Sequence, residues 1–239
     1  MSEHGHGGRR HGRDGGGHGR EHGHGGHGRD RHGNPQDLDA YLARLEDPER
    51  AGWQKPDEVV RALGLREGAV ACDVGAGPGV FALRLARAVG PRGRVHAIDV
   101  EPRILEILRA RAREAGVSNV HPLLAASGDA ALPPEPCEAI LVVNTFHHFP
   151  DGAAALRRLA GALAPGGVIA NVDFHEGELP VGPPPDHKVS RAAFLAAAAA
   201  AGLEVAREET FLPYQYFVLL RPRPIRRARR PRGARAARG

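Results

Sequence analysis

Short apolar runs alternate with longer amphipathic segments through the middle of this chain of 239 residues, and this alternation limits the fold more than any other feature. The apolar runs are expected as buried strands over residues 69–74, 94–100, 119–125, 139–144 and 168–174. The amphipathic segments are expected as helices over residues 80–89, 102–115 and 152–163. Strands that alternate with helices predict parallel β-α-β units, and therefore a doubly wound α/β sheet with helices on both faces.

The pattern changes towards the C-terminus. Ser190 is placed to cap a helix that ends at Gly202, and strands are expected over 203–210 and 214–220. Only a few residues around Pro213 join these two strands, and so short a connection requires an antiparallel pair. The sequence therefore predicts a mostly parallel seven-stranded sheet with an antiparallel terminal strand.

Both ends of the chain differ in composition from this α/β region. Residues 1–33 hold eight of the fourteen histidines, and Met1 is their only aliphatic side chain. Residues 221–239 hold nine arginines and no acid. Such segments cannot bury enough apolar surface to offset their chain entropy. We expect a disordered head and a disordered tail around one domain at 34–220, with 38–63 helical but interrupted before Pro56.

The charge is divided unequally along the chain. Of the net charge of +5, the tail contributes +9 and the head +2, so the remaining 18 basic and 24 acidic groups give the domain −6. The basic isoelectric point is therefore no evidence that the domain binds nucleic acid. Only the tail could attract nucleic acid weakly, and the histidines of the head could bind divalent metals loosely.

The compartment is expected to be the cytoplasm. The two cysteines, Cys72 and Cys137, lie in or beside apolar runs, as buried free thiols of a reducing compartment do. The N-terminus lacks the apolar region of a signal peptide. The longest apolar run, Ala192–Ala201, is too short to span a bilayer, so no membrane segment is expected.

The strongest functional signal is the glycine-rich segment Asp73-Val-Gly-Ala-Gly-Pro-Gly79, between the first expected strand and the next helix. Glycines permit a tight turn that approaches a ligand closely, and the helix start offers free N–H groups. Asp99 ends the second strand, where a carboxylate can accept both hydroxyls of an adenosine ribose. Together these features indicate nucleoside binding, although the glycine turn by itself could be purely structural.

The spacing of the glycines separates two classes of nucleoside-binding enzyme. NAD enzymes carry G-x-G-x-x-G, whereas this segment has G-x-G-x-G with an acid two residues before it. It resembles the first motif of the class I S-adenosylmethionine-dependent methyltransferases. Leu163-Ala-Pro-Gly-Gly-Val-Ile169 resembles the turn before the fifth strand of that family, and the closing hairpin resembles its antiparallel seventh strand. The resemblance covers 56–220 and implies S-adenosyl-L-methionine as cofactor.

The resemblance also assigns residues to the cofactor: Asp73, Gly75, Ala76, Gly77, Gly79, Asp99, Val100, Asp129 and Asn144. The glycine-rich backbone would lie against the methionine portion, and Asp73 would hold its ammonium directly or through water. Asp99 would hold the ribose, and Val100 would lie against the adenine. Family members have an acid soon after the third strand, but here Asp129 comes about three residues late, so Ser127 is an alternative.

Histidines gather after the fourth and fifth expected strands. His147 and His148 follow the fourth strand, and His175 follows the fifth. One of them would act as a general base or orient the acceptor, because the pKa of histidine lies near neutrality. They could instead bind a metal together with Asp173, or only cap the strand ends. Methyl transfer relies mainly on orientation, so a base is not obligatory.

The acceptor is expected to be a small molecule. The fourth strand lacks the Asn/Asp-Pro-Pro-aromatic signature of enzymes that methylate DNA bases, and the chain resembles the ubiquinone/menaquinone C-methyltransferases more closely. It also resembles arsenite methyltransferases but lacks their paired cysteines. An RNA or ribosomal-protein methyltransferase is supported only by the tail, and a metal-linked regulatory module without turnover only by the head. Trp53-Gln-Lys-Pro56 precedes the first expected strand, and Leu212–Tyr216 lies in the terminal hairpin. By the resemblance, the N-terminal segment would cover the cofactor and the hairpin would border the acceptor pocket, or their aromatic side chains would pack in the core.

Overall fold

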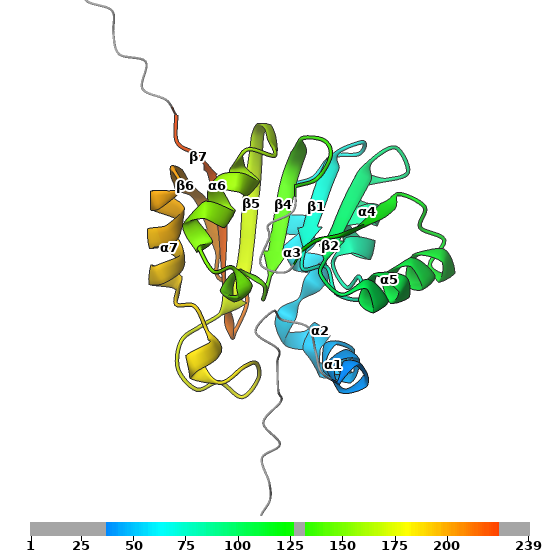
Figure 1. Cartoon of the computed structure of the whole chain (residues 1–239), viewed down its shortest axis with the longest axis horizontal. Helices are drawn as coiled ribbons and strands as arrows, with labels where there is room; N and C mark the ends of the chain where they lie inside the picture. Colours follow the sequence, from blue (N-terminus) through cyan, green and yellow to red (C-terminus); the bar gives the residue numbers. More distant parts are fainter. Residues whose placement is uncertain (1–36, 127–131, 225–239) are drawn as a thin grey trace, which may run out of the picture.

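The protein forms one seven-stranded sheet with the strand order β3-β2-β1-β4-β5-β7-β6 (Figure 1). The computed structural model describes residues 37–126 and 132–224. The strands are β1 (Val70–Val74), β2 (Arg94–Asp99), β3 (Val120–Leu124), β4 (Cys137–Val143), β5 (Leu163–Phe174), β6 (Leu203–Glu209) and β7 (Gln215–Pro222). The first five strands are parallel, and β7 is antiparallel to both β5 and β6. The predicted doubly wound sheet with an antiparallel end is confirmed.

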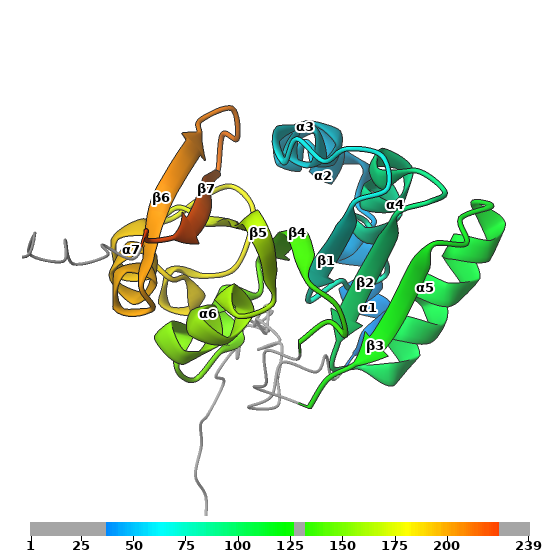
Figure 2. The same ribbon diagram turned by 90° about the horizontal axis from the view of Figure 1, so that it is seen from above.

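Helices cover both faces of this sheet. They are α1 (Leu38–Leu45), α2 (Pro48–Gln54), α3 (Pro56–Ala62), α4 (Ala82–Val89), α5 (Pro102–Glu114), α6 (Gly152–Ala160) and α7 (Arg191–Ala200), with short 3-10 turns η1 (Phe146–His148) and η2 (Pro185–His187). Figure 2 shows α3, α4 and α5 on one side of the sheet and α6 and α7 on the other. Within 37–126 and 132–224, no helix is long and apolar enough to cross a membrane.

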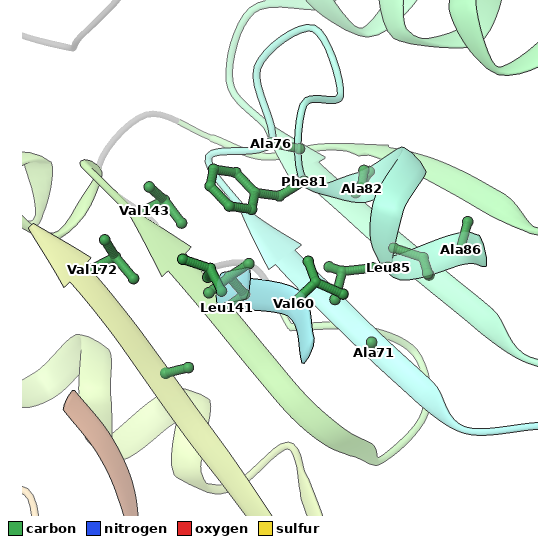
Figure 3. Close-up of a cluster of buried hydrophobic side chains, with 14 of the residues drawn as sticks. Val60, Ala71, Ala76, Phe81, Ala82, Leu85, Ala86, Leu141, Val143 and Val172 are labelled. Atoms are coloured by element: carbon green, nitrogen blue, oxygen red, sulfur yellow. The ribbon is translucent and has the colours of Figure 1, made fainter. Parts of the chain in front are cut away.

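The core between the sheet and helices α3 and α4 holds the glycine-rich turn in place. Figure 3 shows Phe81, directly after the turn, beside Val143 of β4, while Leu85 of α4 lies near Leu141. These four side chains are buried, and Leu85 and Leu141 are fully inaccessible to solvent. Burial of such side chains is the main stabilising contribution to a core. The turn between β1 and α4 is therefore fixed relative to the end of β4.

The N-terminal helical region is divided by its capping residues. The Asp47 carboxylate accepts a hydrogen bond from the backbone N–H of Glu49, and Pro48 occupies the first turn of α2. Lys55 then adopts a left-handed backbone with φ of 46° between α2 and Pro56. The predicted interruption before Pro56 is present, and a further one separates α1 from α2.

Some boundaries differ from the prediction. β5 begins at Leu163 rather than at 168, because its first residue already pairs with Cys137 while the Pro-Gly-Gly turn forms a register shift in the ladder. α6 accordingly ends at Ala160, before the expected 163. β7 continues to Pro222, two residues beyond the expected end of the domain at 220. The Ser190 hydroxyl accepts a hydrogen bond from the Ala193 backbone N–H, so it caps α7 as predicted.

Candidate active site

A pocket lies at the carboxyl ends of β1, β2 and β4. Its walls include the turn after β1, the end of β2 and the segment that follows β4. Helices α1 and α2, which lie beyond one end of the sheet in Figure 1, cover the pocket as a cap. The empty space, including its open mouth, is about 980 Å³. Ligands of open α/β sheets bind at this edge.

The glycine-rich turn forms one wall of the pocket. Gly75, Ala76 and Gly77 line it, and Gly75 and Gly77 have positive φ angles of 74° and 54°. A Cβ atom on Gly75 would lie 2.1 Å from the Thr145 hydroxyl oxygen, so only glycine fits there. The backbone N–H groups of Gly75 and Ala76 donate to the carbonyl oxygen of Ile98 in β2, which ties the turn to the neighbouring strand.

Asp99 lines the pocket at the end of β2, next to Val100. One of its carboxylate oxygens accepts a hydrogen bond from the Gly77 backbone N–H at 2.8 Å, and the other accepts from the Glu101 N–H at 3.1 Å. Burial raises the pKa of Asp99, and these backbone donors oppose the shift. Each carboxylate oxygen keeps a second lone pair for a ligand hydroxyl.

Asp73 lies below the pocket wall rather than in it. Its side chain is 1% exposed, and its Oδ2 atom has no hydrogen-bond partner among the described residues. Burial, and secondly the nearby charge of Asp99, raise the pKa of Asp73 to about 7. A buried carboxylate oxygen without a donor is unfavourable unless a ligand or water supplies one.

Gly79, also assigned to the cofactor by sequence, is not on the pocket wall either. A Cβ atom there would lie 3.2 Å from Leu108 of α5. Gly79 therefore permits close packing between the turn and α5. Asp129 and the alternative Ser127 lie outside the described residues.

Asn144 lines the pocket at the end of β4 in a left-handed conformation with φ of 51°. Its backbone N–H donates to the Val172 carbonyl oxygen of β5, and its side-chain oxygen accepts from Gln215 Nε2 at 2.7 Å. These bonds hold a backbone conformation that is rare for a residue other than glycine. Strain of this kind gathers at functional sites.

The three histidines do not converge on one point. His148 lines the pocket, whereas His147 and His175 do not. The ring of His147 lies 4.1 Å from that of His148, and its Nδ1 is 3.7 Å from Asp173 Oδ2, too far for a hydrogen bond. Both of these atoms are buried without a partner among the described residues. His175 instead lies beside Tyr216.

The alternative of a metal site has no ligand set in the described part of the chain. Within 37–126 and 132–224, no group of three or more histidine, cysteine or acidic side chains could hold a metal ion. His147 and Asp173 form only a pair. Cys72 and Cys137 are buried free thiols, as predicted.

The N-terminal segment was expected to cover the cofactor, but none of the cap residues that line the pocket was assigned to the site from the sequence. Tyr41 and Leu45 come from α1, and Arg50 and Gln54 come from α2. Short helices with few buried residues carry no motif, so nothing in their pattern indicated a pocket wall. Phe81, Val143, Thr145 and Phe149 also line the pocket and were not assigned. The adjacent glycine motif and strand end could have indicated them.

Trp53 attaches the cap to the sheet. Its ring lies 5.7 Å from that of Phe174 at the end of β5 and 6.3 Å from that of Tyr214, measured between centroids. Neither Trp53 nor Tyr214 is on the pocket wall, so the packing alternative holds for both. These aromatic contacts keep α2 over the pocket.

Known proteins are similar to this chain in sequence and in fold. Residues 71–167 match a family model described as a methyltransferase domain. A demethylmenaquinone methyltransferase of Staphylococcus aureus is 28% identical over 129 residues, which are 54% of this chain and 52% of that protein. The chain thus spans about half the length of the curated relatives it matches.

Solved structures extend the comparison over the sheet. An S-adenosylmethionine-dependent methyltransferase from Aquifex aeolicus superposes with a TM-score of 0.70 at 28% identity, over 77% of this chain and 97% of that one. The fold is also similar to the O-methyltransferase NcsB1 of neocarzinostatin biosynthesis, with a TM-score of 0.62 at 20% identity, over 77% of this chain and 58% of that one. With its glycine turn, strand-end carboxylate and antiparallel last strand, the chain is similar to the class I S-adenosylmethionine-dependent methyltransferases.

Proposed function

We propose that this protein transfers a methyl group from S-adenosyl-L-methionine to a small-molecule acceptor. The observation that carries the proposal is one pocket that joins the backbone of Gly75–Gly77 to the carboxylate of Asp99. A nucleoside with an amino-acid extension needs both features, because its ribose presents hydroxyl donors and its extension must lie close to the backbone. The relatives support a methyltransferase of this cofactor.

Two features of the site fit the cofactor. Gly75 lets Thr145 pack directly against the turn, where a Cβ atom would overlap the threonine side chain, and both residues line the pocket. The free Oδ2 atom of Asp73 can accept a hydrogen bond from an ammonium group directly or through water. Asp99 would accept from the ribose hydroxyls, Val100 would lie against the adenine, and Asn144 would border the methionine portion.

The cofactor supplies a methyl group on a positively charged sulfur. The protein has to hold an acceptor atom in line with that methyl group and keep water out, and orientation can account for most of the rate. His148 is the histidine on the pocket wall, so we propose that it orients the acceptor or removes its proton. His147 lies behind it and would act through it, while His175 would border the acceptor at most.

A small-molecule acceptor has the support of the curated relative, whose name describes methylation of demethylmenaquinone. The test incubates the full chain with methyl-labelled cofactor and fractionated cell extract, and follows the label into small molecules, RNA and protein. We expect label in the small-molecule fraction, and less label with Asp99→Ala at a cofactor concentration near the dissociation constant of the wild type. Label that enters only RNA or protein would overturn the choice of acceptor.

The two ends of the chain carry separate proposals. The histidine-rich head, residues 1–33, and most of the arginine-rich tail lie outside the described residues. We propose loose divalent-metal binding for the head, weak nucleic-acid attraction for the tail, and a cytoplasmic location. Deletion of 1–33 should abolish Ni²⁺ binding in a titration, and deletion of 225–239 should abolish retention on heparin. Either property surviving its deletion would contradict the corresponding proposal.

A further inference from the structure

Two side chains of the cap present hydrogen-bond donors to the pocket, and the proposed function so far gives them no role. Arg50 and Gln54 both belong to α2 and both line the pocket. The Arg50 Nε atom donates to Gln54 Oε1 at 2.8 Å. Because this bond occupies the oxygen of the amide, the nitrogen of Gln54 must point elsewhere. That nitrogen is buried without a partner among the described residues, on a side chain only 1% exposed.

Arg50 has a positive charge without a matching carboxylate. No ion pair joins it to a described acid, and its guanidinium lies over the ring of Trp53 at 5.3 Å from the centroid. Burial lowers the pKa of Arg50. The bond to Gln54 uses one of five N–H donors, which leaves the fork of the guanidinium available. A half-buried fork of this kind matches a carboxylate in two parallel hydrogen bonds.

A chain of contacts places these donors at one end of the pocket. The guanidinium of Arg50 lies over the ring of Trp53, which packs on Phe174 of β5. Phe174 pairs in register with Gln215 of β7. Gln215 donates in turn to Asn144, on the pocket wall at the end of β4. In the sheet, β4 and β5 lie on the opposite side of β1 from β2, which carries Asp99. Arg50 and Gln54 are therefore at the end away from the ribose-binding carboxylate.

The charges at this end match an amino-acid group. Donors come from the cap, and the buried carboxylate of Asp73 lies below the glycine turn with a free oxygen. We infer that Arg50 and Gln54 bind the carboxylate of the methionine portion of the cofactor, while Asp73 takes its ammonium from the other side. The inference rests on the proposed function and adds a second, cap-borne part to the cofactor site.

The test compares two nucleosides that differ at this end. S-adenosylhomocysteine has the amino-acid group, and 5′-methylthioadenosine lacks it. Both are titrated calorimetrically into the full-length wild type, Arg50→Ala and Gln54→Met. Because Arg50→Ala removes charge-assisted hydrogen bonds, it should lower the affinity for S-adenosylhomocysteine by about tenfold to a hundredfold. The affinity for 5′-methylthioadenosine should change by less than about threefold, since this nucleoside has no carboxylate to contact the Arg50 guanidinium. Gln54→Met should give a smaller loss with the same selectivity.

Arg44→Ala is the matched control. Arg44 is an exposed arginine of the same cap that lies over the ring of Tyr41 and not on the pocket wall. It should leave both affinities and the thermal midpoint unchanged. If Arg50→Ala weakens both nucleosides equally, or neither, the inference is wrong and Arg50 only supports the cap or contacts the acceptor. If the wild type binds neither nucleoside, the proposed function fails and the inference falls with it.

Discussion

Binding of S-adenosylhomocysteine should release a proton from Asp73. In the ligand-free protein, burial and the charge of Asp99 raise the pKa of Asp73 to about 7. An ammonium group near its free oxygen would stabilise the ionised carboxylate and lower that pKa. At pH 7 about half of the Asp73 side chains are protonated, so binding should release about half a proton per ligand. The release should approach one near pH 6 and vanish near pH 8.

The assay is calorimetry in buffers of different ionisation enthalpy at each pH. The slope of the observed binding enthalpy against the buffer enthalpy gives the number of protons released. Asp73→Asn keeps the shape of the side chain and cannot titrate, so its slope should be near zero between pH 6 and 8. A wild-type slope near zero at pH 6, or an equal slope in Asp73→Asn, would refute the assignment of the ammonium to Asp73.

The same pKa predicts the pH dependence of stability. Because the pKa of Asp73 in the folded protein lies above its ordinary value of 3.8, the folded chain binds more protons than the unfolded chain between these two values. Stability from this group is therefore complete below about pH 4 and is lost as the pH rises to about 7. The loss is about 4 kcal/mol at 1.36 kcal/mol per pKa unit. Denaturant unfolding at pH 5 and 8 should show a smaller loss for Asp73→Asn.

Three further substitutions test separate parts of the site. Asp99→Ala should weaken S-adenosylhomocysteine by about tenfold to several hundredfold in calorimetry, with Asp99→Asn in between, because two charge-assisted hydrogen bonds are lost; unchanged affinity would contradict the ribose assignment. His148→Ala should lower kcat while nucleoside affinity stays within about threefold, and wild-type turnover would exclude an acceptor role. Gly75→Ala should lower both affinity and the free energy of unfolding, whereas Gly116→Ala, with a similar φ of 66° and open space around it, should cost only about 1–2 kcal/mol of stability; equal effects would show that the contact with Thr145 is unimportant.

The sheet was predictable because each of its strands carries a local signal. The run at 69–74 is apolar and bounded by glycines, as a strand buried on both faces must be, and Pro213 marks the short connection of the hairpin. The start of β5 was missed because the Pro-Gly-Gly sequence has the composition of a turn. It nevertheless lies within the ladder, since pairing between Leu163 and Cys137 precedes the register shift. Tertiary pairing here overrides local preference.

The glycine-rich turn of the cofactor site was predictable because its backbone conformation requires glycine residues. Gly75 and Gly77 have positive φ angles, and Gly75 also lies close to Thr145. Few residues other than glycine permit this, so the residue type itself indicates the turn. Asp73 and Gly79 show the limit of this reasoning. Both belong to the motif, but one is buried below the wall and the other packs against Leu108, because a motif does not say which of its members face the ligand.

The resemblance indicated that the N-terminal segment covers the cofactor, but the cap residues that line the pocket could not be predicted, because their position arises only from contacts across the fold. Arg50 and Gln54 lie in α2, a short helix with one buried residue. Their position over the pocket depends on the packing of Trp53 against Phe174 at the end of β5. Nothing within α2 distinguishes Arg50 from the solvated Arg44 of α1. The difference is the burial of one guanidinium beside an amide with a free nitrogen. A buried donor without a partner on a pocket wall indicates a ligand where no motif does, because burying an unmatched donor costs free energy that a bound acceptor recovers.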